Sequence, residues 1–188
     1  MGERNAGQPV SPSDPVTVVK GGWGATSYVG NDLAFPAKRN AAFPASFTDG
    51  LSNTILFAET LKGDGGTRAV TVKRQYVLLD KDALKDVKQD TGVKYFKDGK
   101  NISGDRCASW MDGHFLQTTF NGRLRPNDGR PDVSCGGEGG LSALRNVRDS
   151  YTNIGMADGS VRVIHKVVKL DVWKNLASRN DGNVIPDF

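Results

Sequence analysis

Short apolar runs separated by polar turns dominate the hydrophobic pattern of this chain. Residues 54–60 carry the continuous run Ile-Leu-Phe-Ala, which is typical of a strand buried on both faces. Residues 69–79 indicate a second extended segment, and residues 26–31 indicate a strand or a buried loop. The dipeptide Asp-Gly occurs seven times along the chain, and it supplies the positive φ angles that tight turns require. The pattern therefore predicts a strand-rich fold with many turns.

The clearest hairpin signal lies near the C-terminus. Residues 151–156 and 161–165 are two segments of extended character on either side of the turn Asp158-Gly159-Ser160. Asp-Gly between two apolar runs is a strong short-range signal for a β-hairpin. We therefore expect these segments to pair as antiparallel neighbours.

Two short helices are predicted from apolar residues at helical spacing. Within residues 171–178 the apolar positions, Trp173 and Leu176 among them, form a stripe that should cover the sheet. The other helix is expected over residues 81–89, where Asp80 has the character of an N-cap. Together with the strands, these helices predict an α+β fold that is rich in strands.

The chain is expected to form one globular domain over residues 23–188. Residues 1–22 are rich in Pro, Ser, Gly and Asn, and they predict a flexible or surface-hugging lead-in. Residues 103–146 hold two prolines, Asp-Gly pairs and a glycine-rich run, so we expect a long irregular loop insertion there. We expect its part from Cys107 to Gly140 to be the variable surface that meets partners.

Length and composition support a single folded domain. The chain has 188 residues, of which 37% are hydrophobic, and a chain of this size buries roughly 70% of its unfolded surface. No window approaches 18 consecutive apolar residues, and the first residues lack the apolar core of a signal peptide. We therefore expect any targeting segment to be absent or removed.

The charge pattern argues against a nucleic-acid partner. The net charge is only +4 and the basic residues are scattered among acidic ones. Nucleic-acid binding draws on clustered cations that release counterions from the phosphates. A solvated surface of mixed charge is the expectation.

No catalytic constellation stands out. His114 and His165 are the two histidines, and they match no zinc motif. The chain also lacks a nucleophile elbow and a phosphate-binding loop. An acid–base pair of Asp112 with His114 is the one enzymatic alternative, and a polar turn explains the same residues. We expect a protein that is not an enzyme and that needs no cofactor.

Two further kinds of site stay open at the level of sequence. Cys107 and Cys135 would form a disulfide in an oxidising compartment or remain free thiols elsewhere. Asp181, Asn183 and Asp187 offer oxygen donors at short spacing and are calcium candidates, although they match no calcium-loop pattern and plain turns are favoured.

An ordered succession of blocks resembles one family. The blocks are residues 26–31, residues 47–56 with Glu59, residues 119–121, and the C-terminal segment 153–164. They are similar to the pseudopilin-like domain of unknown function that is expanded in Planctomycetes, which carries a C-terminal motif of His, nine residues and Asp-Gly. Asp158-Gly159 matches this Asp-Gly, whereas Arg148 stands at the position of the motif histidine.

The resemblance implies a fold, a location and a role. Full-length members carry a prepilin-type leader and a long apolar N-terminal helix, followed by a head with an antiparallel sheet. This chain is then expected to be the head without that helix. The head would be extracytoplasmic, anchored to the membrane only through the helix, and part of a type IV pilin-like or type II secretion pseudopilin-like assembly. Its partners would be other pilin-like subunits or secretion-system components.

A binding module is the alternative role. The long loop holds Trp110, Phe115 and Phe120, aromatic residues that would stack on the sugar rings of a glycan if they were exposed. Packing in the core is the competing expectation for at least two of them. In this alternative the same extracytoplasmic head recognises a glycan or another solute.

Overall fold

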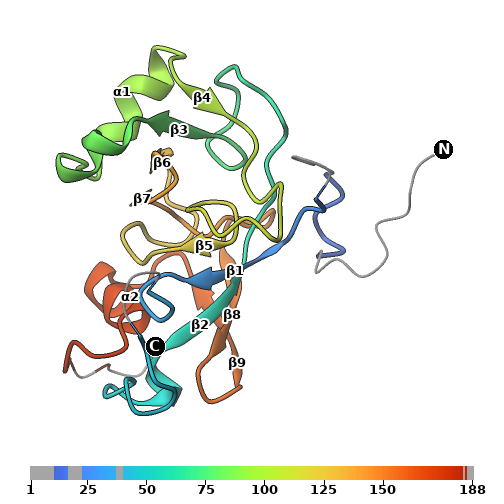
Figure 1. Ribbon diagram of the computed structural model, residues 1–188. Helices are drawn as coiled ribbons and strands as arrows, with labels where there is room; N and C mark the ends of the chain where they lie inside the picture. Colours follow the sequence, from blue (N-terminus) through green and yellow to red (C-terminus); the bar gives the residue numbers. More distant parts are fainter. Residues whose placement is uncertain (1–10, 17–22, 37–39, 184, 186–188) are drawn as a thin grey trace.

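Two β-sheets and two α-helices make up the domain (Figure 1). The computed structural model describes residues 11–16, 23–36, 40–183 and 185. The larger sheet has the strand order β5-β1-β2-β8-β9, and the smaller sheet has the order β4-β3-β6-β7. The strands of the larger sheet are β5 (Thr119–Phe120), β1 (Tyr28–Asn31), β2 (Ile55–Glu59), β8 (Tyr151–Met156) and β9 (Val161–His165). Those of the smaller sheet are β4 (Ile102–Ser103), β3 (Tyr76–Leu79), β6 (Asp132–Cys135) and β7 (Gly139–Leu141).

Both sheets are mixed, which confirms the strand-rich α+β class but corrects the expectation of one antiparallel sheet. In the larger sheet β1 pairs with β5 in parallel, and in the smaller sheet β3 pairs with β6 in parallel. The remaining pairs are antiparallel. The parallel partners, β5 and β6, come from within residues 103–146. A segment expected to be a loop therefore adds β5 to the larger sheet and both β6 and β7 to the smaller one.

The C-terminal hairpin forms as predicted. Strands β8 and β9 pair antiparallel, with Gly155 opposite Val161 next to the turn. Gly159 has a φ of 85°, which favours glycine, and the Asp158 carboxylate accepts hydrogen bonds from the backbone N–H and the hydroxyl of Ser160 at 2.9 and 2.6 Å. These bonds lower the pKa of Asp158. The Asp-Gly-Ser motif is therefore a structural turn.

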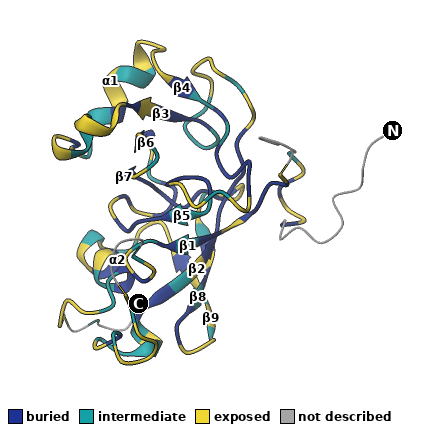
Figure 2. Cartoon of the chain, in the orientation of Figure 1, coloured by how far each residue is buried: buried dark blue, intermediate teal, exposed yellow. Residues whose placement is uncertain are grey.

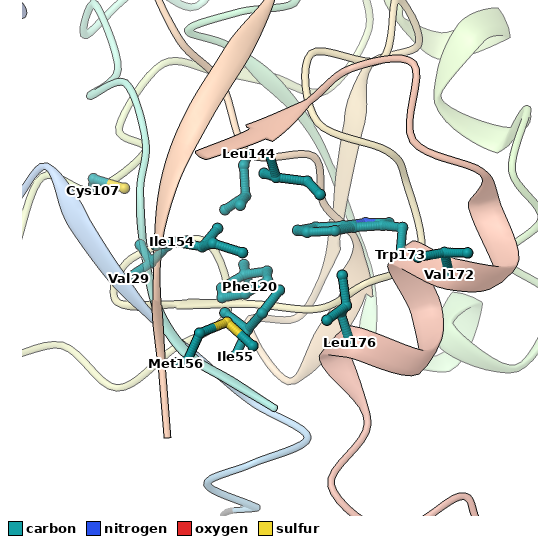
Figure 3. Close-up of a cluster of buried hydrophobic side chains, with 12 residues drawn as sticks. Val29, Ile55, Cys107, Phe120, Leu144, Ile154, Met156, Val172, Trp173 and Leu176 are labelled. Carbon is teal, nitrogen blue, oxygen red and sulfur yellow. The ribbon is translucent and has the colours of Figure 1, made fainter. Parts of the chain in front are cut away.

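The predicted terminal helix covers one side of the larger sheet. Helix α2 (Leu170–Ala177) places Trp173 and Leu176 in the main hydrophobic cluster, where both are fully buried. The Trp173 ring stacks against Phe120 at 6.3 Å between centroids, and its Nε1 donates to the carbonyl oxygen of Leu124 at 2.7 Å. Figure 3 shows these rings with Leu144 and Ile154 around them. The cluster joins α2 to β2, β5 and β8.

The helix expected over residues 81–89 is shorter than predicted. Lys81–Lys85 form a 3₁₀ helix, and α1 (Thr91–Lys97), which the pattern did not predict, follows it. Val87 is buried between the two and packs into a second cluster with strands β3, β6 and β7. The second sheet thus has its own small core.

Strand β2 is buried on one face rather than both. Ile55 and Ala58 are buried, whereas Phe57 is 52% exposed on the outer side of the larger sheet, where the Phe35 ring packs against it. The extended segment 69–79 is likewise shorter than predicted, since only its last four residues form strand β3. The continuous apolar run in residues 54–60 therefore has two origins: some of its side chains lie in the core, and Phe57 lies on the exposed outer face.

Residues 103–146 are largely buried rather than a variable surface loop (Figure 2). Among them Leu124, Val133 and Leu141 are fully buried in the cluster of the smaller sheet. The turn-rich composition correctly predicted irregular connections, but the apolar residues between the turns are part of the hydrophobic core. The segment is part of the framework of the domain.

A buried ionic network links the two sheets. The Asp132 carboxylate, at the start of β6, is bound by the guanidinium groups of Arg106 and Arg145, and all three side chains are buried. Arg106 also donates to the hydroxyl of Thr60, just after β2, at 3.0 Å. Arg145 donates to the carbonyl oxygen of Arg130 at 2.7 Å. One carboxylate therefore holds two buried cations at the junction.

The described part of the lead-in is tethered. Residues 11–16 include Asp14, whose carboxylate accepts from the backbone N–H of Lys62 at 2.8 Å and pairs with Arg74 at 2.9 Å. The Asp14 side chain is buried. These contacts hold residues 11–16 against the domain. The other residues of 1–22 lie outside the described part of the chain.

Candidate functional site

One face of the larger sheet is covered and the other is open. On the inner face the side chains of β1, β2, β8 and β9 pack into the cluster beneath α2. On the outer face four large apolar side chains are 44% to 75% exposed: Tyr28, Phe57, Val161 and Val163. We call these four residues the open face. Glu59 and Asn153, which share a hydrogen bond of 2.9 Å, lie on the same face among them. Exposed apolar side chains gathered on one face of a sheet are a candidate interaction surface.

A glycine sits between the side chains of the open face. Gly155 is paired with Phe57 on one side and with Val161 on the other. A Cβ on Gly155 would lie 3.8 Å from its nearest neighbour, an ordinary contact distance, and the residue has no left-handed φ. The fold itself therefore does not require glycine here. Its effect is that no side chain stands between Phe57 and Val161 on this face.

A pocket of about 550 Å³ lies where the two sheets meet. The segment after β1 supplies Asp32 and Phe35, and the loop before β5 supplies His114. Leu84 from the 3₁₀ helix and Glu138 from the β6–β7 turn come from the side of the smaller sheet. Pockets at the junction of structural units, with apolar walls and a few polar groups, are typical ligand sites.

Asp32 is an acid of this pocket whose surroundings disfavour its charged form. Its Oδ1 atom is inaccessible to solvent and has no hydrogen-bond partner in the described structure. Burial raises the pKa of the Asp32 carboxyl to about 7, although the backbone N–H of Leu33 and the charge of Arg123 oppose the shift. A carboxyl kept in such a position at a cost to stability is a candidate functional group.

Replacing Asp32 with asparagine is expected to stabilise the protein at neutral and alkaline pH. Because the folded-state pKa is raised from 3.8 to about 7, the wild type loses stability as the pH rises through this window and the loss is complete above it. Asp32→Asn removes this loss. Urea unfolding of both proteins should show the advantage of the variant growing by roughly 2 to 3 kcal/mol between pH 5 and pH 8. An advantage that does not change with pH would show that Asp32 ionises normally.

A larger pocket, of about 800 Å³, is lined by three cations, Arg125, Arg130 and Lys166, and the last two already have partners. Arg130 donates to the Asp128 carboxylate at 2.8 Å and to the side-chain oxygen of Gln89 at 2.8 Å. Lys166 pairs with Asp149 at 3.1 Å. These ion pairs leave less of the cationic charge for an anionic ligand, so the smaller pocket is the stronger candidate.

The structure separates the three aromatic residues predicted for glycan stacking. Trp110 is 48% exposed, but Phe115 and Phe120 are buried. Phe120 belongs to the core beneath α2, and Phe115 packs with Tyr76 and Leu116 at the wall of the smaller pocket. The expectation that at least two of them pack inside is confirmed, and no stacking platform of all three forms.

The residues of the enzymatic alternative are neighbours. The His114 ring contacts the Asp112 carboxylate through Nδ1, and the ring itself is exposed at the rim of the smaller pocket. The ring packs on Gly137, where a Cβ would lie 2.7 Å from it. The contact between His114 and Asp112 fixes the rim of the smaller pocket. Asp32 lies in the same pocket and was not predicted from the sequence. The available signal was an acidic residue directly after a strand of the family blocks.

The two cysteines are free in the structure and belong to different clusters. Cys107 is buried with the core beneath α2, whereas Cys135 lies in the core of the smaller sheet. The candidate disulfide is therefore not formed, because each thiol is part of a separate core. Burial raises the pKa of the Cys107 thiol to about 11 and also raises that of Cys135.

The calcium candidates act as turn residues where they are described. The Asp181 carboxylate accepts from the backbone N–H of Asn183 at 2.9 Å, and Asp49 accepts from the N–H groups of Asp181 and Gly182 at 2.7 and 2.9 Å. Asp187 lies outside the described residues. Within the described ranges no group of three His, Cys, Asp or Glu side chains gathers around a common point.

Arg148, at the position of the motif histidine, lies beside β8. Its guanidinium donates to the hydroxyl of Tyr151 at 2.6 Å and stands 5.8 Å from the centre of that ring. The Tyr151 ring in turn contacts His165 edge to face at 6.2 Å. The motif position therefore supports the end of the hairpin opposite its Asp-Gly turn.

The described residues contain no helix that is long and apolar enough to cross a membrane. No curated protein and no solved structure gives a significant match to the chain. A family model does match, over residues 2–170, and its description is "Protein of unknown function (DUF1559)". Since the match spans most of the sequence, the chain belongs to the DUF1559 family.

Proposed function

We propose that this chain is the extracytoplasmic head of a pilin-like or pseudopilin-like subunit, whose open face packs against an apolar helix. The helix would be the long N-terminal helix that the resemblance to planctomycete pseudopilin-like proteins implies. Its partners would be other pilin-like subunits or secretion-system components. In this role the head works by packing and assembly, without catalysis or a cofactor.

The single observation that carries this proposal is the open face. Antiparallel strands usually have one face in the core and one polar face in water, but here Phe57 and Val161 are exposed on either side of Gly155. Burying apolar side chains of this size stabilises a contact by about 1.5 to 3 kcal/mol each. A helix that lays its apolar side along these strands would bury all four residues of the open face.

Cysteine accessibility tests the proposal directly. Both native cysteines are buried, so a cysteine placed at Phe57 is the main target for a maleimide reagent. Phe57→Cys should react quickly in the purified 188-residue chain and at least tenfold more slowly in the protein at its natural location in the cell. Val70→Cys, at a position that is 77% exposed away from the sheets, should react equally in both settings.

A substitution at Gly155 gives a second readout. Gly155→Val should leave the head as stable as the wild type or slightly more stable, because valine suits a strand better than glycine and its Cβ would lie no closer than 3.8 Å to a neighbour. It should nevertheless reduce incorporation of the subunit into its assembly, since a side chain would then stand between Phe57 and Val161. Equal reactivity of Phe57→Cys in both settings, together with normal assembly of Gly155→Val, would contradict the proposal.

Solute binding is the second candidate function. The name of the family model, SBP_bac_10, hints at a solute-binding domain, and the pocket between the sheets offers a place for a ligand. A glycan platform built from Trp110, Phe115 and Phe120 is not favoured, because two of these rings are buried. A glycan array that returns binders lost in Trp110→Ala would favour this role.

A further inference from the structure

We propose that the pocket between the two sheets binds a small organic cation, a primary ammonium group carried on an apolar stem. The inference concerns a ligand site and does not depend on the pilin-like role. It rests on the charges, the walls and the position of this pocket.

The charges around the pocket favour a cation. Asp32 and Glu138 both line it, and Asp112 contacts the rim residue His114. Glu138 is bound by the ammonium group of Lys81. The charge of Arg123 acts on Asp32, but two of its guanidinium N–H groups donate to the carbonyl oxygens of Gly140 and Val87, both at 3.1 Å. Among the described residues no cation forms a direct ion pair with the Asp32 carboxylate, so a ligand cation would be its first ion-pair partner.

A bound cation would offset the unfavourable free energy of burying the ionised Asp32 carboxylate. An ionised carboxylate with an unpartnered, inaccessible oxygen is unfavourable in a protein interior, and an opposite charge nearby is the interaction that offsets this cost most strongly. A neutral sugar or alcohol can donate a hydrogen bond but supplies no charge. A metal ion would need several oxygen ligands, and the described residues provide no such group.

The walls of the pocket determine the rest of the ligand. Leu33, Phe35 and Leu84 line it together with Phe115, and Leu33 and Phe35 are each exposed by nearly half. These side chains suit an alkyl stem, and an aromatic ring also attracts a cation that lies over its face. An ammonium group directed at Asp32, with its stem along these side chains, matches both features.

Titration with n-butylammonium chloride tests the proposal, with n-butanol and sodium butyrate as neutral and anionic probes of the same size. Two-dimensional amide NMR of the 188-residue chain at pH 7.5 should show saturable shifts for residues 32–35, 113–115 and 137–138 with the ammonium compound. The other two probes should bind at least tenfold more weakly. Equal binding of n-butanol would show an apolar pocket without charge selection and would overturn the proposal.

Matched variants assign the effect to Asp32. Asp32→Asn, which should remain folded and become more stable, is expected to weaken n-butylammonium binding by about tenfold or more. Asp98→Asn, an exposed acid just after α1, should leave it unchanged. Glu138→Gln should produce a smaller loss. Binding that survives in Asp32→Asn, or no saturable shift in the wild type, would refute the assignment.

Discussion

Asp132→Asn should destabilise the domain by about 3 to 5 kcal/mol, because it removes the single carboxylate that holds two buried guanidinium groups. Arg106 and Arg145 would then lie in the interior with no anionic partner, and the Nε atoms of both already lack a hydrogen-bond partner. The network joins β6 to the ends of β2 and β7, so its loss loosens both sheets together. Urea unfolding followed by tryptophan fluorescence measures the change.

Two controls separate the network from a general effect of removing a charge. Asp98→Asn removes an exposed carboxylate and should change the free energy of unfolding by less than about 0.5 kcal/mol. Adding Arg106→Met to Asp132→Asn should cost less than the sum of the two single changes, since one unpaired cation is removed with the carboxylate. Additive losses in this cycle would show that Arg106 and Asp132 do not act together.

Trp173→Ala should cost roughly 3 to 5 kcal/mol and lower the melting temperature by about 10 °C. The side chain is fully buried between α2 and the larger sheet, stacks on Phe120, and donates to the carbonyl oxygen of Leu124 at 2.7 Å. Truncation leaves a large cavity and an unpaired carbonyl. Differential scanning calorimetry gives the shift.

Trp110 provides the matched control for this change. It is the same residue type but 48% exposed, so Trp110→Ala should lower the melting temperature by no more than about 2 °C. Trp173→Phe should fall between the two, because it keeps most of the packing and loses the hydrogen bond to Leu124. A small effect of Trp173→Ala would mean that α2 does not contribute to the core.

The two candidate surfaces use different parts of the domain. The open face lies on the outer side of the larger sheet, whereas the pocket lies between the sheets and is lined mainly by loops. Phe35 connects them, because its ring packs against Phe57 at 5.6 Å between centroids and also lines the pocket. Assembly and ligand binding can still be tested with separate substitutions, Gly155→Val on the open face and Asp32→Asn in the pocket.

Local sequence patterns predicted those elements that are stabilised by residues close together in the chain. The Asp158-Gly159-Ser160 turn was predictable because Gly159 supplies the positive φ and Asp158 binds the backbone two residues on. Helix α2 was predictable because its apolar residues recur at helical spacing over enough turns to form a stripe. The ordered blocks of residues resembled a domain family of unknown function, and the family model that matches residues 2–170 agrees with this coarser assignment.

The tertiary structure alone decided which distant segments meet. The parallel pairs of β1 with β5 and of β3 with β6 join segments far apart in the chain, and no local signal specifies such partners. The same pairing buries residues 103–146, whose turn-rich composition resembles that of an exposed loop. It also brings Asp32 from one sheet toward Glu138 from the other. A pocket made by long-range contacts is a property of the packed fold, because the burial that raises the pKa of Asp32 exists only once the two sheets come together.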